Sequence, residues 1–146
     1  MRLDMKSIHH RILITLIFVL LALTACQGGS EIGKEEEIEG AFYRIVTVQE
    51  LQRMLEAKDF LMVNVHIPWE GDIPQTDLRL PYDQIEQSIE QLPEDRDAKI
   101  LVYCLTSGMA KKAVATLVSQ GYTDVWMLDG GTTAWSEAQL PLNSKP

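Results

Sequence analysis

From residue 42 onward, apolar residues fall into two patterns that alternate along the sequence. Short apolar runs rich in Val, Ile, Leu and Tyr are typical of strands that are buried on both faces of a sheet. Such runs occupy residues 42–46, 60–66, 78–80, 99–103 and 124–128. Between them, apolar residues recur at helical spacing. Strands that alternate with helices through short loops predict an α/β fold with a parallel sheet covered on both faces.

The helical pattern is clearest after Cys104. From Ala110 to Val118, apolar side chains recur on one face, and Gly121 follows at the position of a helix-ending glycine. This helix and the neighbouring strands should supply most of the core. The side chains predicted to be buried are Val63, Val65, Leu101, Val102, Val114, Leu117 and Val125.

Three further segments complete the folded part. Thr47 and Glu50 have the spacing of a capping box, which predicts a helix over residues 48–58. A second helix is predicted over residues 81–92, where isoleucine and leucine recur at helical spacing before a proline. A short helix should follow the Asp-Gly-Gly turn at residue 131, and the Pro-Leu-Asn-Ser-Lys-Pro tail is expected to be unstructured.

The N-terminus has the pattern of an export signal. Basic residues precede an apolar stretch over residues 12–23, and Leu-Thr-Ala-Cys follows, ending at Cys26. This box resembles the lipobox of bacterial lipoproteins, in which the cysteine becomes the lipidated N-terminus. Residues 1–25 are therefore predicted to be a lipoprotein signal peptide, which places the domain outside the cytoplasm on a lipid anchor. The alternative is an uncleaved N-terminal anchor.

The segment that follows Cys26 is rich in glycine and glutamate and nearly free of apolar residues. Such a composition buries too little apolar surface to fold, so residues 26–40 are predicted to be a flexible acidic tether. The run of glutamates at residues 35–37 is interpreted as part of this spacer. The folded domain is then expected over residues 41–143.

Charge and cysteine content narrow the function further. A net charge of −8 argues against nucleic acid as a partner and against electrostatic adhesion to anionic lipid. The chain has two cysteines, and with Cys26 lipidated Cys104 is the only thiol. No metal-binding motif such as HExxH or CxxC occurs, and we expect no metal and no cofactor.

Cys104 is the candidate nucleophile because of where it falls between two elements. It lies at the carboxyl end of a buried strand, just before a helix begins. Unpaired N–H groups and the helix dipole favour a thiolate or a bound anion at such a position. Ligands also bind outside the carboxyl ends of the strands in parallel sheets. The simpler alternative is a buried cysteine that packs as a small apolar residue.

Residues 43–142 resemble the rhodanese family. The likeness rests on Val-Tyr-Cys at the strand end and on QGYTDVWMLDGGTTAW further along. The resemblance implies a five-stranded parallel sheet with helices on both faces, and a cysteine that carries sulfur as a persulfide between a small donor and a thiol acceptor. It also implies that backbone N–H groups cradle the charged sulfur. Here these groups would belong to Leu105, Thr106, Ser107, Gly108 and Met109.

The active-site loop departs from the family pattern. The common loop is C-R-x-G-x-R-S, whereas residues 104–110 read C-L-T-S-G-M-A. Without arginine, the loop lacks a bidentate partner for an anionic donor, which predicts a donor less anionic than thiosulfate. A phosphatase loop of the form C-x5-R is excluded for the same reason. The glycine has moved to Gly108, where it is able to adopt a positive φ.

The polar residues around the loop differ too. Asn64 and His66 stand where the family has Asp and Arg, which predicts a weaker supporting shell. His66 is a candidate substrate contact, and the alternative is a hydrogen-bonded structural histidine.

The sequence thus predicts a membrane-anchored, extracytoplasmic sulfurtransferase that works through a Cys104 persulfide. The alternatives are a rhodanese-fold module that binds without catalysis and a redox sensor based on the same thiol. The sequence identifies no protein partner.

Overall fold

Six strands form one sheet within residues 31–144, which are the residues that the computed structural model describes. They are β1 (Lys34–Ile38), β2 (Ala41–Val46), β3 (Leu61–Asn64), β4 (Leu78–Arg79), β5 (Ile100–Tyr103) and β6 (Val125–Leu128), in the order β1-β2-β6-β5-β3-β4. All neighbouring strands pair in parallel except β1, which runs antiparallel to β2. The predicted α/β fold is confirmed, but the sheet is mixed and has six strands in place of the expected five.

The additional strand is β1, and it corrects the prediction of a tether over residues 26–40. Within that range the structure forms a strand over Lys34–Ile38, joined to β2 by a tight turn in which Glu39 and Gly40 have φ of +52° and +83°. The sequence argument considered only side-chain burial. The strand is held instead by backbone pairing to β2, and Ile38 packs against the core. The charged side chains of β1 meanwhile stay largely in solvent.

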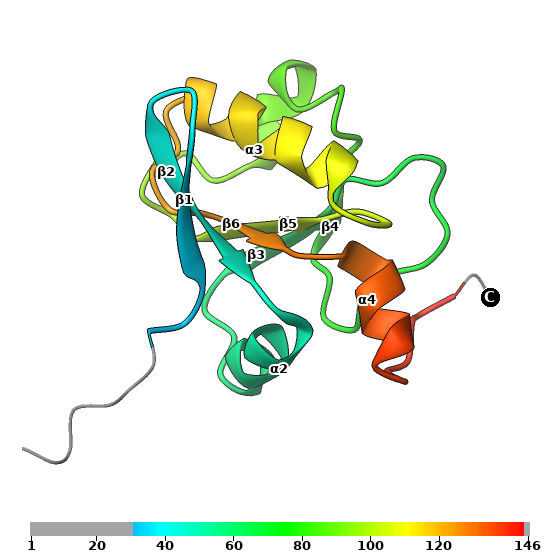
Figure 1. Ribbon diagram of the computed structural model, residues 1–146. Coiled ribbons are helices and arrows are strands. Elements are labelled where there is room, and N and C mark those ends of the chain that lie inside the picture. The colour runs from blue at the N-terminus through cyan, green and yellow to red at the C-terminus, as the bar shows by residue number, and fades with distance from the viewer. Residues whose placement is uncertain (1–30, 145–146) are drawn as a thin grey trace, which may run out of the picture. The chain divides into compact units, whose positions relative to one another are not determined.

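Helices cover both faces of the sheet, as Figure 1 shows. On one face lie α3 (Gly108–Ser119) and the 3-10 helix η1 (Glu86–Gln91), and on the other lie α2 (Val48–Glu56) and α4 (Gly131–Glu137). Successive side chains along a strand therefore point to opposite faces of the sheet and pack in two separate cores. Val102 belongs to the core under α3, and its neighbour Leu101 belongs to the core shared with α2 and α4.

Most of the predicted elements are confirmed. Thr47 caps α2, with its hydroxyl 3.3 Å from the backbone nitrogen of Glu50, whose carboxylate accepts from the Thr47 N–H at 2.8 Å. Gly121 ends α3 with a φ of +89°. All seven side chains predicted for the core are buried: Val63, Val65, Leu101, Val102, Val114, Leu117 and Val125.

The prediction of an α-helix over residues 81–92 is wrong. Only the short 3-10 helix η1 forms there, and Ser88 interrupts it with a non-helical φ of −124°. Ile85 and Leu92 are nevertheless buried against the core below α3. Tight turns bring these two side chains inward, including a hydrogen bond of 3.1 Å from the Leu92 N–H to the Ile89 carbonyl. The apolar spacing thus predicted burial correctly, whereas the non-helical backbone of Ser88 interrupts the segment between Ile85 and Leu92.

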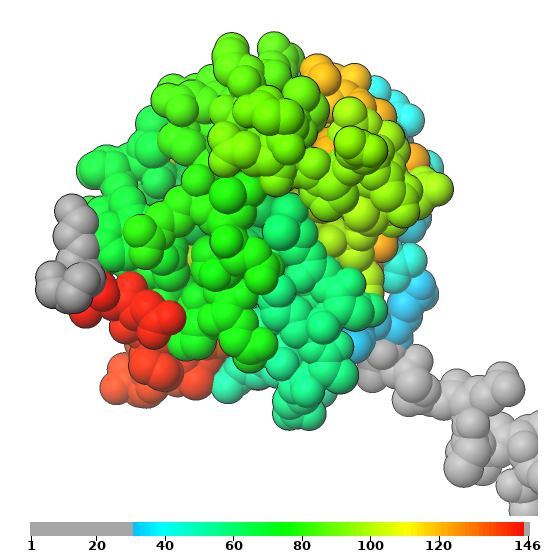
Figure 2. Space-filling model, turned by 180° about the vertical axis from the view of Figure 1, so that it is seen from behind, coloured from blue at the N-terminus to red at the C-terminus, as the bar shows by residue number. Residues whose placement is uncertain are grey.

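The C-terminal segment is also more ordered than predicted. Asn143 forms an antiparallel bridge with Asp72, through backbone hydrogen bonds of 3.0 and 2.8 Å. Trp135 of α4 donates its indole N–H to the carbonyl of Pro141 at 2.9 Å. Figure 2 shows this C-terminal segment, in red, lying against the green segment that follows β3. Backbone pairing of this kind needs no side-chain periodicity, which is why the sequence pattern did not reveal it.

The predictions for the N-terminus are not tested by the fold. The proposed signal peptide, residues 1–25, and Cys26 lie outside the described residues. Among residues 31–144, no helix has the length and apolar character needed to cross a membrane.

Candidate functional site

Cys104 directly follows β5 and lies at the carboxyl edge of the parallel strands. It is 1% exposed and belongs to the core beneath α3. Directly after the neighbouring strand β3, the N–H of Val65 donates to the carbonyl of Tyr103 at 2.9 Å, which fixes the end of β5 just before the cysteine. The predicted position of Cys104, between a buried strand and a helix start, is therefore confirmed.

The backbone after Cys104 offers a row of free donors. The N–H groups of residues 105–109 have no acceptor among residues 31–144, whereas the N–H of Ala110 donates to the Cys104 sulfur at 3.4 Å. These groups lie at the N-terminus of α3, where the helix dipole adds positive potential. The arrangement favours a negative charge on the Cys104 sulfur or on an atom bound to it. The cradle of Leu105 to Met109 remains a prediction, and its donors are present.

Gly108 does not have the positive φ that the sequence analysis considered. It is the first residue of α3 and has a helical backbone, because the helix starts one residue after Ser107. Ser107 does not cap this helix through its side chain. Its hydroxyl instead donates to Asp129 Oδ1 at 3.1 Å and accepts from the Gly130 N–H at 3.0 Å. Ser107 thus ties the loop to the turn before α4.

The start of α4 holds the loop from its other side. The N–H groups of Thr132 and Thr133 donate to the carbonyls of Cys104 and Leu105, each at 2.9 Å. Gly131 makes this approach possible, because a Cβ atom there would lie 2.1 Å from the Cys104 carbonyl oxygen. The sequence analysis noted the Gly-Gly pair but did not find this role. The available signal was the place of the Gly-Gly pair directly after a predicted strand, within the segment that resembles the rhodanese family.

Tyr103 fixes the other flank of the loop. Its phenol oxygen accepts from the Ile73 N–H at 3.1 Å and lies 2.6 Å from the Thr76 hydroxyl. Burial raises the pKa of Tyr103 to about 12, so the phenol keeps its proton even in mildly alkaline solution. The residue before the nucleophile is therefore anchored to the segment that follows β3.

The polar shell near the loop is organised around Asp72, a partner of Asn64 that the sequence analysis did not identify. The Asn64 amide donates to Asp72 Oδ1 at 2.9 Å, and the indole of Trp69 donates to the same oxygen at 2.9 Å. Arg79 donates to Asp72 Oδ2 at 2.7 Å and stacks on Trp69 at 3.9 Å from the ring centroid. The family pattern puts the acidic residue at position 64, whereas here the carboxylate that binds these donors belongs to Asp72.

Asp72 is a buried carboxylate with three side-chain donors. Burial alone would raise its pKa, but the hydrogen bonds from Arg79, Asn64 and Trp69 together hold the pKa of Asp72 below its usual value of 3.8. Asp72 is therefore ionised at neutral pH, and its charge keeps these donors in place. Its backbone also holds Asn143 of the C-terminal segment.

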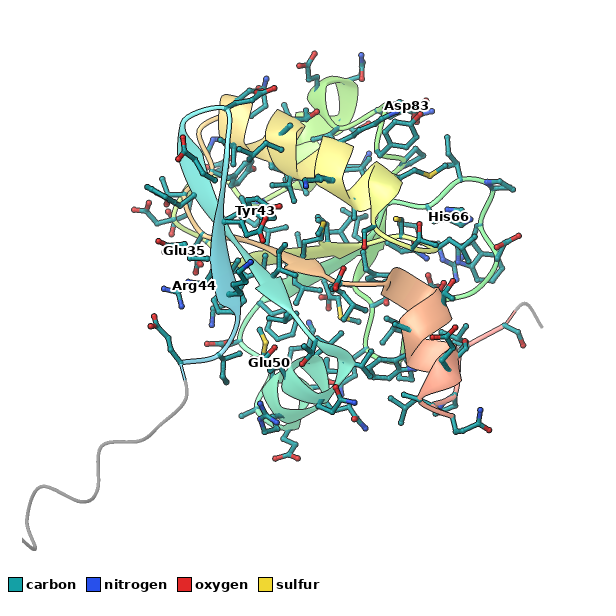
Figure 3. The ribbon with its side chains drawn as sticks, in the orientation of Figure 1. Glu35, Tyr43, Arg44, Glu50, His66 and Asp83 are labelled. Carbon is teal, nitrogen blue, oxygen red and sulfur yellow. The ribbon has the colours of Figure 1, made fainter. Side chains whose placement is uncertain are left out.

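His66 lies at the same edge of the sheet as the loop. Figure 3 shows it at the end from which α3 and α4 start, whereas Tyr43 and Arg44 lie toward the opposite end. Its Nε2 is 3.5 Å from Glu70 Oε2, and its Nδ1 is buried and has no hydrogen-bond partner among residues 31–144. No hydrogen bond within the described residues joins its imidazole to residues 104–109. A substrate contact by His66 therefore remains a prediction.

A groove opens beside the loop. Its volume is about 530 Å³, and its walls come from Leu105, from α4 and the residues after it, and from Glu70. Residues 31–144 hold no group of three or more His, Cys, Asp or Glu side chains placed to bind a metal ion. The chemistry available at this edge of the sheet is therefore that of one thiol, a row of backbone donors and an adjoining groove.

A strand-end cysteine, a donor-lined loop and a mostly parallel sheet covered by helices are the features expected of a rhodanese-like domain. The sequence profile of that domain matches residues 47–138, and the chain belongs to the rhodanese-like family. The chain is 36% identical over 94 residues to a sulfurtransferase of Allochromatium vinosum, an overlap that covers 62% of this chain and 85% of that protein.

Two further relatives support the family assignment. A thiosulfate sulfurtransferase of Vibrio cholerae is 30% identical over 101 residues, covering 68% of this chain and 93% of that protein. Among solved structures, a rhodanese-like domain protein from Staphylococcus aureus superposes with a TM-score of 0.58 at 25% identity, covering 70% of this chain and 98% of that one. The predicted family and fold are thus confirmed.

Proposed function

We propose that this protein is a rhodanese-type sulfurtransferase that moves sulfane sulfur through a persulfide on Cys104, and that a lipid on Cys26 holds it outside the cytoplasm at a membrane. One observation carries the catalytic part. Cys104 lies at a strand end where the Ala110 N–H points to its sulfur and the N–H groups of residues 105–109 have no acceptor among the described residues. The sulfurtransferase relatives support the same chemistry.

The reaction needs two displacements at sulfur and no net oxidation. The Cys104 thiolate attacks the outer sulfur of a donor persulfide R–S–S⁻, the donor S–S bond breaks, and the thiolate R–S⁻ leaves. The outer sulfur then sits on Cys104 as a persulfide anion, which the free N–H groups of the loop stabilise. A thiolate acceptor attacks that sulfur, takes it away as a new persulfide, and restores the Cys104 thiolate.

The loop favours a donor that has no charged oxygen atoms to bind. No arginine or lysine lies among residues 104–110, so the sulfonate-like oxygens of thiosulfate have no bidentate partner there. A polysulfide or a small persulfide needs only the backbone donors. We therefore infer that thiosulfate is a poor donor for this protein.

The catalytic proposal is tested by intact mass after incubation with a polysulfide or glutathione persulfide. The wild type is expected to gain about 32 Da, the mass of one sulfur, and Cys104→Ser to gain nothing. Absence of an adduct from any donor, with Cys104 shown to be reduced and accessible, would overturn the enzyme proposal in favour of a binding module. A sulfenic acid or mixed disulfide in place of the persulfide would indicate a redox sensor.

Donor choice is tested by restoring a cation in the loop. Met109→Arg is expected to raise turnover with thiosulfate more than turnover with a persulfide, because the guanidinium pairs with the anionic oxygens. Met109→Gln, similar in length and uncharged, is the control. Equal gains with both donors would mean that arginine improves the loop in general and does not recognise an anion.

The anchor is tested separately, since it depends on the sequence alone. Cys26→Ala is expected to release the domain from the membrane fraction, because the lipid attachment site is lost. If the variant stays with the membrane after washing without detergent, the uncleaved apolar segment of residues 12–23 is the anchor instead.

A further inference from the structure

We propose that the groove beside Leu105 binds the carrier part of the sulfur substrate and selects carriers with a positive charge. The substrate class would be a small aliphatic persulfide or thiol with an ammonium group. This inference rests on the proposed sulfur transfer, and it adds which molecules deliver or accept the sulfur.

The groove is joined to the reacting loop by direct backbone contacts. Leu105, the residue after the nucleophile, forms one wall, and Thr132 and Thr133 of α4 form another. The same two threonines donate their N–H groups to the carbonyls of Cys104 and Leu105 at 2.9 Å. A molecule in this groove therefore lies beside the loop that carries the sulfur.

The lining suits a short carbon chain with a polar end. Leu105 is 37% exposed, one of the exposed large apolar side chains of the described domain, and it faces the groove together with Leu142. Thr132, Thr133 and Ser136, whose side chains carry hydroxyl groups, also line the groove. A hydroxyl group is able to donate a hydrogen bond to the polar end of a ligand or to accept one from it. The volume of about 530 Å³ is within the range of small-molecule sites.

The charge of the lining is negative. Glu70 and Glu137 both border the groove, and no lysine or arginine does. Glu70 lies 3.5 Å from His66 Nε2, and Glu137 has no ion pair with any described residue. An ammonium group near these carboxylates is attracted and a carboxylate or sulfonate is repelled. The groove and the loop without arginine therefore both disfavour donors with anionic groups.

The test compares three small hydropersulfides of different charge: those of cysteamine, 2-mercaptoethanol and 3-mercaptopropionate. Because their leaving thiols also differ in pKa, each rate is divided by the rate of the same donor with free cysteine. The rate of sulfur transfer to Cys104 in the purified full chain is followed by intact mass, with Cys104→Ser as the blank. The expected order of rates is cationic, neutral, anionic. The cationic donor should exceed the anionic one by about three- to tenfold, as exposed ion pairs permit. This ratio should shrink in high salt.

Two double variants separate the groove from the overall charge. Glu70→Gln with Glu137→Gln is expected to bring the ratio of cationic to anionic rates to within about twofold. The control is Glu90→Gln with Glu94→Gln, which removes the same charge from exposed positions outside the groove lining and should keep the ratio.

The outcomes distinguish the two proposals. Equal rates for all three donors in the wild type would overturn the charge selection while supporting the persulfide chemistry. An equal fall of the ratio in both double variants would assign the effect to net charge and also overturn the role of the groove. No adduct from any of the three donors would instead overturn the proposed function itself.

Discussion

Gly131 lies against the carbonyl groups of the Cys104 loop, in a backbone conformation with a φ of +55°. Gly131→Ala is expected to destabilise the fold by more than the 1–2 kcal/mol of an unfavourable φ alone, since its Cβ would lie 2.1 Å from the Cys104 carbonyl oxygen. Persulfide formation should slow as well, because the loop must shift. Chemical denaturation and the intact-mass time course measure the two effects.

Gly40→Ala is the matched control for this substitution. Gly40 also has a positive φ, +83°, but a Cβ there meets no atom within 4 Å. It should cost only the conformational penalty and leave persulfide formation unchanged. If Gly131→Ala costs no more than Gly40→Ala, the contact between α4 and the loop does not hold the site.

Asp72 makes stability depend on pH. Its pKa is lower in the folded protein than its usual value of 3.8, so its stabilising contribution is present above that value and is lost as pH falls through the folded pKa. The difference in unfolding free energy between the wild type and Asp72→Asn should therefore narrow as pH is lowered from about 5 to about 2. A difference that stays constant over this range would mean that the charge of Asp72 contributes nothing.

The residues of the site were predictable to different degrees. The position of Cys104 followed from the junction of an apolar strand and a periodic helix, a local pattern. The role of Gly131 and the carboxylate at Asp72 depend on contacts between segments far apart in the chain. In the sequence, Asn64 in place of Asp indicates the loss of a carboxylate. Only the fold shows that the carboxylate of Asp72 lies beside Asn64.

α3 is the element whose packing is simplest to test. Leu117 is 1% exposed and lies in the core under this helix. Leu117→Ala should lower the unfolding free energy by about 2–5 kcal/mol, from lost burial and the cavity left behind. Lys111→Ala, on the exposed face of the same helix, should change it by less than about 0.5 kcal/mol. A loss below that value for Leu117→Ala would show that the buried face has been assigned wrongly.

At the scale of elements, burial was predicted better than backbone conformation. Strands β3, β5 and β6 are buried on both faces, so they read as continuous apolar runs in the sequence. The segment of residues 81–92 showed its buried anchors but not its 3-10 geometry. β1 gave no apolar signal, because its pairing with β2 is made by backbone groups.

The C-terminal segment contacts α4, the segment that follows β3 and the groove beside the loop. Ending the chain after Leu140 would remove the carbonyl that accepts from Trp135, the bridge between Asp72 and Asn143, and the Leu142 side of the groove. The truncated protein is expected to lose about 1–3 kcal/mol of stability, measured by chemical denaturation. Asn143→Ala keeps the backbone bridge and should stay within about 0.5 kcal/mol. A truncated protein as stable as the wild type would show that the segment is not part of the folded unit.

The glutamates of β1 have a consequence for contacts between molecules. β1 ends the strand order, so one of its sides has no neighbouring strand among the described residues. An open edge of this kind is a template on which a second copy can extend the sheet and begin to aggregate. A second β1 docked there would bring the carboxylates of residues 35–37 of both copies together, and like charges on adjacent strands repel. The acidic edge is therefore expected to oppose sheet extension between copies at neutral pH.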